Sequence, residues 1–236
     1  MNYNILKIIK GFWTVACGLE FYKIHILLIG GRRLAYTLTE IKDDIITLSS
    51  KDFYIKYILR SDNWYFENHI GQSKEKAIGL TDDFKSIVSQ SLNISFNNIA
   101  IVGSSKVGCS LTPVSEQQDK LFRCFDQESS DIDIAIVSEK LFQRFWSLFR
   151  HSYSEINKRH YKFISRGIYR GYINEKYLTL IDGCRKEWNE KAVESKKLLR
   201  NELYIRPEIT YRLYRSWEDF EEYHIQSIDE IKRSEI

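Results

Sequence analysis

The chain has 236 residues and a net charge of +3, and 43% of its residues are hydrophobic and 14% aromatic. This composition supplies enough apolar side chains for a packed core, which excludes an intrinsically disordered chain. The mildly basic balance, with a pI near 8.5, does not by itself indicate a nucleic-acid-binding protein. The length suits one domain with additions, or one domain with a small helical companion.

The cysteines indicate a reducing environment. They form no C-x-x-C pair and have no metal-binding spacing relative to the five histidines. We therefore expect reduced thiols and a cytoplasmic protein. The four residues are Cys17, Cys109, Cys124 and Cys184.

Residues 1–80 are predicted to form a mixed, largely helical extension that packs on the rest of the chain. Glu20 and Lys23 interrupt the first apolar region, so we expect no membrane-spanning segment. A strand is predicted at Tyr22–Ile29, followed by a turn at Gly30–Arg33.

Three helices are predicted before residue 95. Thr39 and Ser50 are candidate N-caps of the first two, and Thr81 is the candidate cap of the third. In this third helix one apolar stripe should face the core, and we expect the second domain, residues 81–236, to begin here. The stripe consists of Phe84, Ile87, Val88 and Leu92.

A short apolar, β-branched run at Ile99–Val102 predicts a strand, and Gly103-Ser104 ends it. Glycine allows the backbone to pass close to another group. The serine hydroxyl and the free N–H groups of such a turn suit a bound phosphate.

The next predicted strand starts at Asp131 and carries Asp133 two residues later. Residues i and i+2 of a strand leave the same face, about 6.6 Å apart, while Ile132, Ile134 and Ile136 take the other face, in the core. Two carboxylates on one face of an apolar strand are costly to desolvate unless a cation lies between them. A hard divalent cation that also holds nucleotide phosphates, such as Mg²⁺, fits this pattern.

Together, "VGSSKVGCSLTP" and "SSDIDIAIVS" resemble the DNA polymerase β-like nucleotidyltransferase superfamily, in its bacterial stand-alone branch. The resemblance implies that Gly103 and Ser104, with the adjacent Ser105 and Lys106, hold the nucleotide phosphates. It also implies that Asp131 and Asp133 hold Mg²⁺ or Mn²⁺. A surface strand with two merely solvated aspartates, or a fold of this type that has lost activity, are the alternatives.

The polar segment 112–130 separates the two motifs and is longer than in small members of the superfamily. It predicts a loop beside the site, either a lid or only an insertion. After the second motif, an apolar stripe from Leu141 to Phe149 predicts a core-facing helix. Residues 150–163 are basic with interleaved aromatic side chains, which suits either an exposed helix and loop or a contact with nucleic acid or triphosphate.

The C-terminal part is predicted to be a helix, a strand and a final helix. Ile168–Ile181 fits either a strand–turn–strand unit or a short helix, and Arg185–Leu203 is predicted to be helical. Alternation at Glu208–Arg215 predicts a strand. A last helix from Ser216 carries His224 on its apolar stripe, where a packed histidine is favoured over a ligand.

In the resembled superfamily a third acidic residue on a later strand completes the metal site. The corresponding position here is Thr210, which is not acidic. Glu208, on the same strand face, is the best substitute, and Asp182 is the second. Arg212, also on that face, is predicted to stabilise negative charge on the phosphates.

We expect an α/β (α+β) fold in which a small, mixed, mostly antiparallel sheet is flanked by helices. The predicted activity is Mg²⁺-dependent transfer of a nucleoside monophosphate from an NTP or dNTP to a hydroxyl of a protein, a tRNA or a growing oligonucleotide. The resemblance implies a role in phage defence or a toxin–antitoxin system, with a separately encoded effector or antitoxin as partner. The competing hypotheses are a degenerate nucleotide-binding or interaction module and a non-catalytic nucleic-acid-binding protein.

Overall fold

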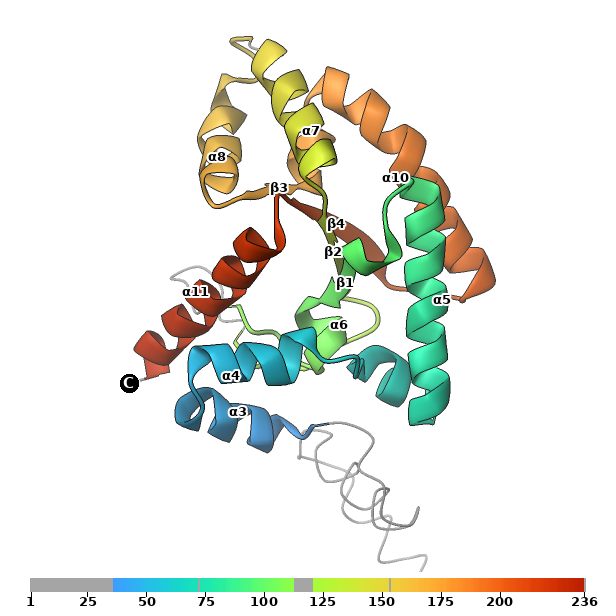
Figure 1. Ribbon diagram of the computed structural model, residues 1–236, viewed down its shortest axis with the longest axis vertical. Coiled ribbons are helices and arrows are strands. Elements are labelled where there is room, and N and C mark those ends of the chain that lie inside the picture. Colours follow the sequence, from blue (N-terminus) through green and yellow to red (C-terminus); the bar gives the residue numbers. More distant parts are fainter. Residues whose placement is uncertain (1–35, 72, 113–120, 153, 236) are drawn as a thin grey trace, which may run out of the picture. The chain divides into compact units, whose positions relative to one another are not determined.

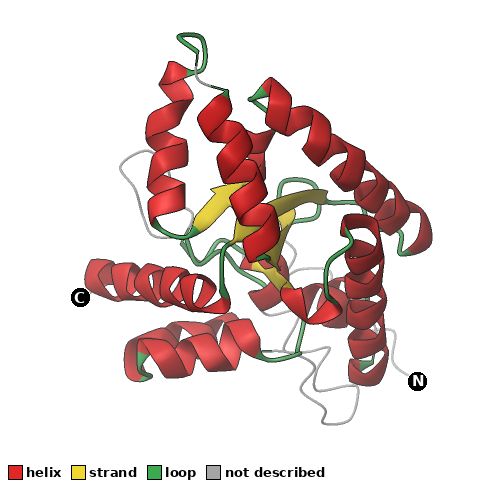
Figure 2. Ribbon diagram, turned by 45° about the horizontal axis from the view of Figure 1, so that its top comes forward, coloured by secondary structure: helices red, strands yellow, loops and turns green. Residues whose placement is uncertain are grey.

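A four-stranded mixed sheet lies at the centre of the described chain, in the order β1-β2-β4-β3 (Figure 2). β1 pairs antiparallel with β2, β2 pairs parallel with β4, and β3 pairs antiparallel with β4. This confirms the predicted mixed sheet flanked by helices, in an α/β chain. The strands are β1 (Ile99–Val102), β2 (Asp131–Val137), β3 (Tyr172–Asn174) and β4 (Glu208–Tyr214).

This computed structural model describes residues 36–71, 73–112, 121–152 and 154–235. The expected strand at Tyr22–Ile29 and the turn at Gly30–Arg33 lie outside these residues. Chain contacts group residues 35–236 into one unit, so the predicted domain boundary at residue 80 falls inside a helix of that unit. Within the described part of the chain, no helix is long and apolar enough to cross a membrane.

One face of the sheet packs against the larger hydrophobic core. Alternation along β2 places Ile132, Ile134 and Ile136 on this face, where all three are at most 1% exposed, as predicted. Ile209 and Tyr211 of β4 join them. The helices that contribute side chains to this core are α5 (Lys74–Leu92), α7 (Glu139–His151), α8 (Lys158–Tyr169), α9 (Glu175–Leu178) and α10 (Asp182–Glu202).

The opposite face carries the second core, and it is also the face of the two aspartates. Ala135, Val137 and Tyr214 point to this side and are buried. Because both faces of β2 are covered, β2 is a central strand. The elements on this side are α3 (Leu38–Thr47), α4 (Ser50–Tyr54), the π-helical turn η1 (Ile55–Leu59), α6 (Gly103–Val107) and α11 (Trp217–Glu235) (Figure 1).

The first two helices begin earlier than predicted. Thr37, not Thr39, caps α3, because its side chain accepts a hydrogen bond from the Glu40 N–H at 3.2 Å while the Glu40 carboxylate accepts one from the Thr37 N–H at 2.8 Å. This reciprocal capping box requires an acidic residue three positions after the cap, which Thr39 lacks. Ser49 caps α4, because its hydroxyl oxygen accepts a hydrogen bond from the Asp52 N–H at 3.0 Å.

The third helix, α5, begins at Lys74 with Ser73 as its cap, so the predicted start at Thr81 is wrong. The Thr81 hydroxyl instead donates to the Ala77 carbonyl within the helix, at 2.8 Å. A threonine satisfied in this way does not end a helix. The predicted apolar stripe is confirmed for Phe84, Val88 and Leu92, which are buried. The π-helical turn η2 (Tyr65–His69) precedes α5, and the 3₁₀ turn η3 (Phe96–Asn98) follows it.

The C-terminal elements largely follow the predicted order. The segment 168–181 was predicted to be either a strand–turn–strand unit or a short helix. It contains the short strand β3 and the short helix α9. α10 begins at Asp182, three residues before the predicted start at Arg185. β4 is the predicted strand, with Ile209, Tyr211 and Leu213 buried on one face.

Candidate functional site

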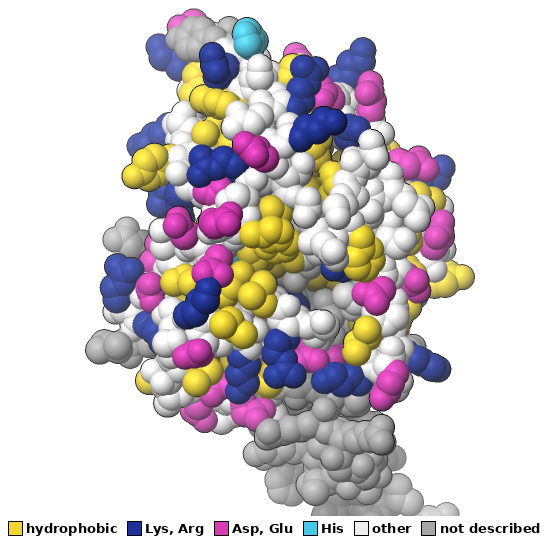
Figure 3. Space-filling model, viewed as in Figure 1, with side chains coloured by type: hydrophobic (Ala, Val, Ile, Leu, Met, Phe, Trp, Pro, Cys, Tyr) yellow, Lys and Arg dark blue, Asp and Glu magenta, His cyan; other side chains and the backbone are white. Residues whose placement is uncertain are grey.

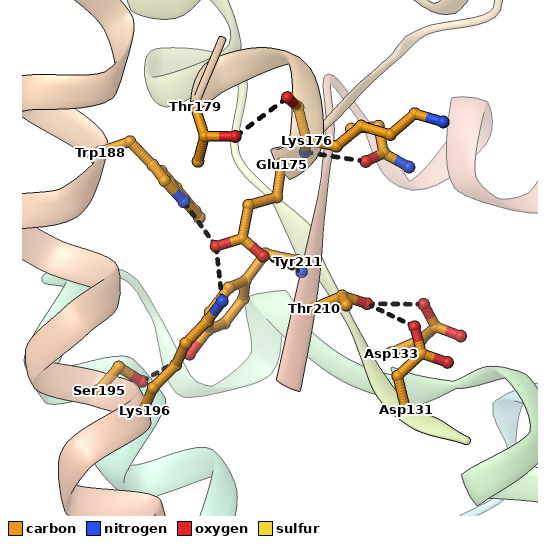
Figure 4. A network of polar contacts seen from close by, with 11 residues as sticks. Asp131, Asp133, Glu175, Lys176, Thr179, Trp188, Ser195, Lys196, Thr210 and Tyr211 are labelled. Carbon is orange, nitrogen blue, oxygen red and sulfur yellow. Dashed lines mark hydrogen bonds and ion pairs between the residues drawn. The ribbon is translucent and has the colours of Figure 1, made fainter. Parts of the chain in front are cut away.

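The two aspartates share one face of β2 and one hydrogen-bond donor on the neighbouring strand. In the register of β2 and β4, Asp133 lies opposite Thr210, and Asp131 lies opposite Glu208. The Thr210 hydroxyl is 2.9 Å from Asp133 Oδ1 and 3.5 Å from Asp131 Oδ2 (Figure 4). Thr210, at the strand position predicted for a third acid, thus donates to Asp133 and lies at the limit of hydrogen-bond distance from Asp131.

The negative charge of this pair is only partly compensated. Burial, and then the charge of Asp131, raise the pKa of Asp133 to about 6, against the lowering effects of Arg212 and of the Thr210 hydrogen bond. The two carboxylates thus form an electrostatically unfavourable pair in the free protein. A bound cation would relieve this repulsion.

The Gly-Ser turn meets the carboxylates directly. Val102, the last residue of β1, pairs with Asp133, and Gly103 follows with φ +71°. A Cβ atom on Gly103 would lie 2.4 Å from Asp133 Oδ2. Only glycine combines this left-handed backbone with such a close approach. The structure therefore brings together the two predicted motifs, which are distant in sequence.

A cavity of about 260 Å³ opens onto this meeting point. It lies between the aspartate face of the sheet, the start of α6, residues 110–112 with Arg123, and α11. Its lining includes the predicted Gly103, Ser104, Asp131, Asp133 and Arg212. It further includes Ser110, Thr112, Arg123, Ser130, Tyr223, His224 and Ser227.

Arg212 supplies a cation at the back of the cavity. Its guanidinium carbon lies 5.3 Å from the ring centre of Tyr172 and 4.8 Å from that of Tyr223. Burial lowers the pKa of Arg212, but the neighbouring Tyr214, Tyr223 and Asp133 together raise it by more. The net pKa lies above the ordinary value of arginine, so the side chain stays charged. Its buried Nε has no hydrogen-bond partner among the described residues. Arg212 lines the cavity, so an anion bound there would meet its positive charge.

Two predicted phosphate-binding residues do not line the cavity. Ser105 is fully buried, and its hydroxyl donates to the Val102 carbonyl at 3.1 Å. The Lys106 ammonium donates to the carbonyls of Arg60 and Asp62. Burial lowers the pKa of Lys106 to about 8. Lys106 thus holds α6 against the segment that follows η1. The motif alone does not reveal this structural contact.

The candidate third acids also lie outside the cavity lining. Glu208 is exposed at the start of β4, opposite Asp131. Asp182 is 86% exposed and forms an ion pair with Arg185. Among the described residues, no group of three or more His, Cys, Asp and Glu side chains is suited to hold a metal ion. Among the described residues that line the cavity, the groups available to a cation are the two β2 carboxylates and the neighbouring hydroxyls.

The residues that the sequence analysis missed come from segments without a strong local signal. Arg123 lies in the polar loop region, and Ser227 and Tyr223 lie on α11 beside the predicted apolar stripe. His224 Nδ1 is 2.7 Å from the Phe220 carbonyl oxygen. Burial, and then the charge of Arg212, lower the pKa of His224 to about 4. The helical spacing of 223, 224 and 227 is the one signal that relates them.

Comparison of the chain with protein-family models, with curated proteins and with solved structures found no match.

Proposed function

We propose that this chain is a nucleotidyltransferase that uses a divalent cation to transfer a nucleoside monophosphate from an NTP or dNTP to a hydroxyl group. The observation that supports this proposal is the convergence of Gly103, Ser104, Asp131 and Asp133 on one cavity. Gly103 and Ser104 open α6 directly after β1, the two aspartates lie on β2, and all four are residues that the superfamily resemblance singles out. Their meeting at one end of the antiparallel β1–β2 pair is a geometric condition that the proposed site requires.

Asp131 and Asp133 would hold the cation, with Mg²⁺ or Mn²⁺ as the expected ion. The fit rests on oxygen ligands only, on an unrelieved pair of negative charges, and on the raised pKa of Asp133. A cation bound there would neutralise charge on the phosphates. Thr210 would keep the two carboxylates oriented toward it through its hydroxyl.

Ser104 and Arg212 would bind the phosphate oxygens, with the Gly103 backbone at close approach. In the reaction, the acceptor oxygen forms a bond to the α-phosphorus, and the bond from that phosphorus to the bridging oxygen of the β-phosphate breaks. Pyrophosphate leaves, and the hydroxyl proton passes to water or to a carboxylate. Arg212 would stabilise the charge that develops on the phosphates.

Glu208 is the proposed third acid, and it would act from the open end of β4 opposite Asp131. The phage-defence or toxin–antitoxin setting, with a separately encoded partner, follows from the resemblance. Thr210 at the third-acid position favours one alternative, a nucleotide-binding module without turnover, because a hydroxyl brings no negative charge.

The test is incubation of the purified protein with Mg²⁺ or Mn²⁺ and each α-³²P-labelled NTP or dNTP, alone and with total RNA. Products are resolved on denaturing protein and nucleic-acid gels. Asp131→Asn and Asp133→Asn should abolish labelling, and Glu208→Gln should reduce it. Asp83→Asn, an exposed aspartate on α5, is the matched control and should label like the wild type.

Labelling that persists in Asp131→Asn would contradict the proposed transfer. Nucleotide binding without label in any reaction would establish the binding module instead.

A further inference from the structure

Helix α8 presents a basic face without any acidic residue. Its sequence, KRHYKFISRGIY, places exposed cations at four positions along one side of the helix. Lys158 pairs with Glu155 at 3.4 Å, whereas Arg159, Lys162 and Arg166 form no ion pair among the described residues. Positive charge on this face is therefore concentrated rather than balanced. The four residues are Lys158, Arg159, Lys162 and Arg166.

Aromatic side chains are interleaved with these cations. Phe163 is 56% exposed and Tyr169 is 91% exposed, although both are large and largely apolar. Phe163 stacks on Tyr177 of α9, with ring centres 6.3 Å apart and planes within 10°. Figure 3 shows basic and hydrophobic side chains side by side at the upper left of the molecule, where Figure 1 places α8.

The basic face continues to the candidate site. Arg170, which ends α8, lies 5.1 Å from the ring centre of Tyr223, and Arg212 lies on the same ring at 4.8 Å. Tyr223 lines the cavity. The cations of α8 thus extend outward from the place where the phosphates of a nucleotide would lie.

We infer that this α8 face, defined as Lys158, Arg159, Lys162, Phe163 and Arg166, binds a single-stranded nucleic acid that is the acceptor of the proposed transfer. Lysine and arginine neutralise successive phosphates, while an exposed stacked ring offers a platform to a base. An acidic protein segment would use the charges but would leave the exposed rings without a stacking partner. The cavity, at about 260 Å³, is also too small to enclose a nucleotide together with its acceptor.

The role of the nucleic acid as acceptor rests on the proposed function. Its binding to the α8 face does not, and it is measured separately. The probe is a fluorescein-labelled 20-nucleotide single-stranded RNA of mixed sequence, in EDTA without nucleotide, followed by anisotropy from 50 to 300 mM salt. Lys162→Ala with Arg166→Ala should weaken binding and reduce the slope of log affinity against log salt by about 1.4, at about 0.7 per phosphate contact. Phe163→Ala should weaken binding roughly fivefold or more without changing the slope.

The matched control is Lys76→Ala with Lys186→Ala, which removes two exposed cations from α5 and α10 and should leave RNA affinity within twofold. Equal RNA binding by the Lys162/Arg166 variant and the wild type would overturn the inference, and so would absent RNA binding. Poly-L-glutamate that competes as well as unlabelled RNA would overturn it in favour of an acidic protein partner.

The two proposals fail in different ways. Asp131→Asn should still bind the RNA in EDTA, because Asp131 is not on the α8 face. RNA binding that depends on α8, together with absent labelling of any acceptor, would retain the inferred surface and reject the transferase. Labelling of RNA that is unchanged in the Lys162/Arg166 variant would retain the transferase and reject the α8 face.

Discussion

At the scale of single residues, Gly103 carries the most specific constraint. Its backbone is left-handed, and its missing side chain leaves room for Asp133. Gly103→Ala should therefore displace the Asp133 carboxylate, abolish nucleotide binding and transfer, and destabilise the fold by roughly 1–2 kcal/mol. Urea unfolding and nucleotide titration of the same preparation check both effects.

Gly79→Ala is the matched control for this prediction. Gly79 lies inside α5, and a Cβ atom there would meet nothing within 4 Å. This substitution should stabilise the chain by about 0.5–1 kcal/mol and leave the site intact. If Gly103→Ala behaved like Gly79→Ala, the close approach of the turn to Asp133 would be wrong.

At the scale of elements, Glu175 joins α9, α10 and β4. Its carboxylate accepts hydrogen bonds from Trp188 Nε1 at 2.8 Å and from the backbone N–H of Tyr211 at 3.0 Å, and it pairs with Lys196 at 2.9 Å (Figure 4). β3 ends at Asn174, so the Glu175 side chain takes up a β4 donor just beyond the last pair of that ladder. The network fixes β4, and with it Thr210 and Arg212, against the helices.

Glu175→Ala should cost about 3–5 kcal/mol of stability, because the buried donors of Trp188 and Tyr211 and the partly buried Lys196 ammonium lose their acceptor at once. Chemical denaturation measures this cost. Glu194→Ala, an exposed position on α10, is the control and should change stability by less than about 0.5 kcal/mol. A loss below about 1 kcal/mol for Glu175→Ala would show that the network contributes little.

At the scale of the whole molecule, two groups that line the cavity, Asp133 and His224, should give opposing pH dependences of stability. The pKa of Asp133 is raised to about 6 in the folded state, so the folded state binds the extra proton and stability falls as pH rises from about 4 to 6. The pKa of His224 is lowered to about 4. The unfolded state then binds the extra proton, and stability rises as pH increases from about 4 to 6.5.

Each effect is isolated by the difference between a variant and the wild type, measured by urea unfolding in EDTA from pH 4 to 7.5. The gain in stability from Asp133→Asn should grow to roughly 3 kcal/mol as pH rises to 7. The effect of His224→Gln should become more favourable as pH falls toward 4. Differences that do not change with pH would show that neither group is perturbed by burial.

The amino-acid sequence by itself determined the apolar strands, the shared face of Asp131 and Asp133, and the stripes of α5, α7 and α11. These features depend on periodicity alone, because side chains alternate along a strand and recur every three or four residues along a helix. Thr210 was singled out as the residue at the third-acid position of the resembled superfamily, and the sheet register places it opposite Asp133. The Gly103-Ser104 turn was identified as a feature that permits close approach, although not as one that touches Asp133.

Only the tertiary structure decided what each polar residue contacts. Ser105 and Lys106 follow the turn directly, yet they bond to the backbone of Val102 and of the segment after η1. Arg123 lies 20 positions after Gly103, and Tyr223 and Ser227 lie about 120 positions after it, yet all three line the cavity. Such contacts arise from how the sheet and helices pack, and local sequence periodicity carries no information about them.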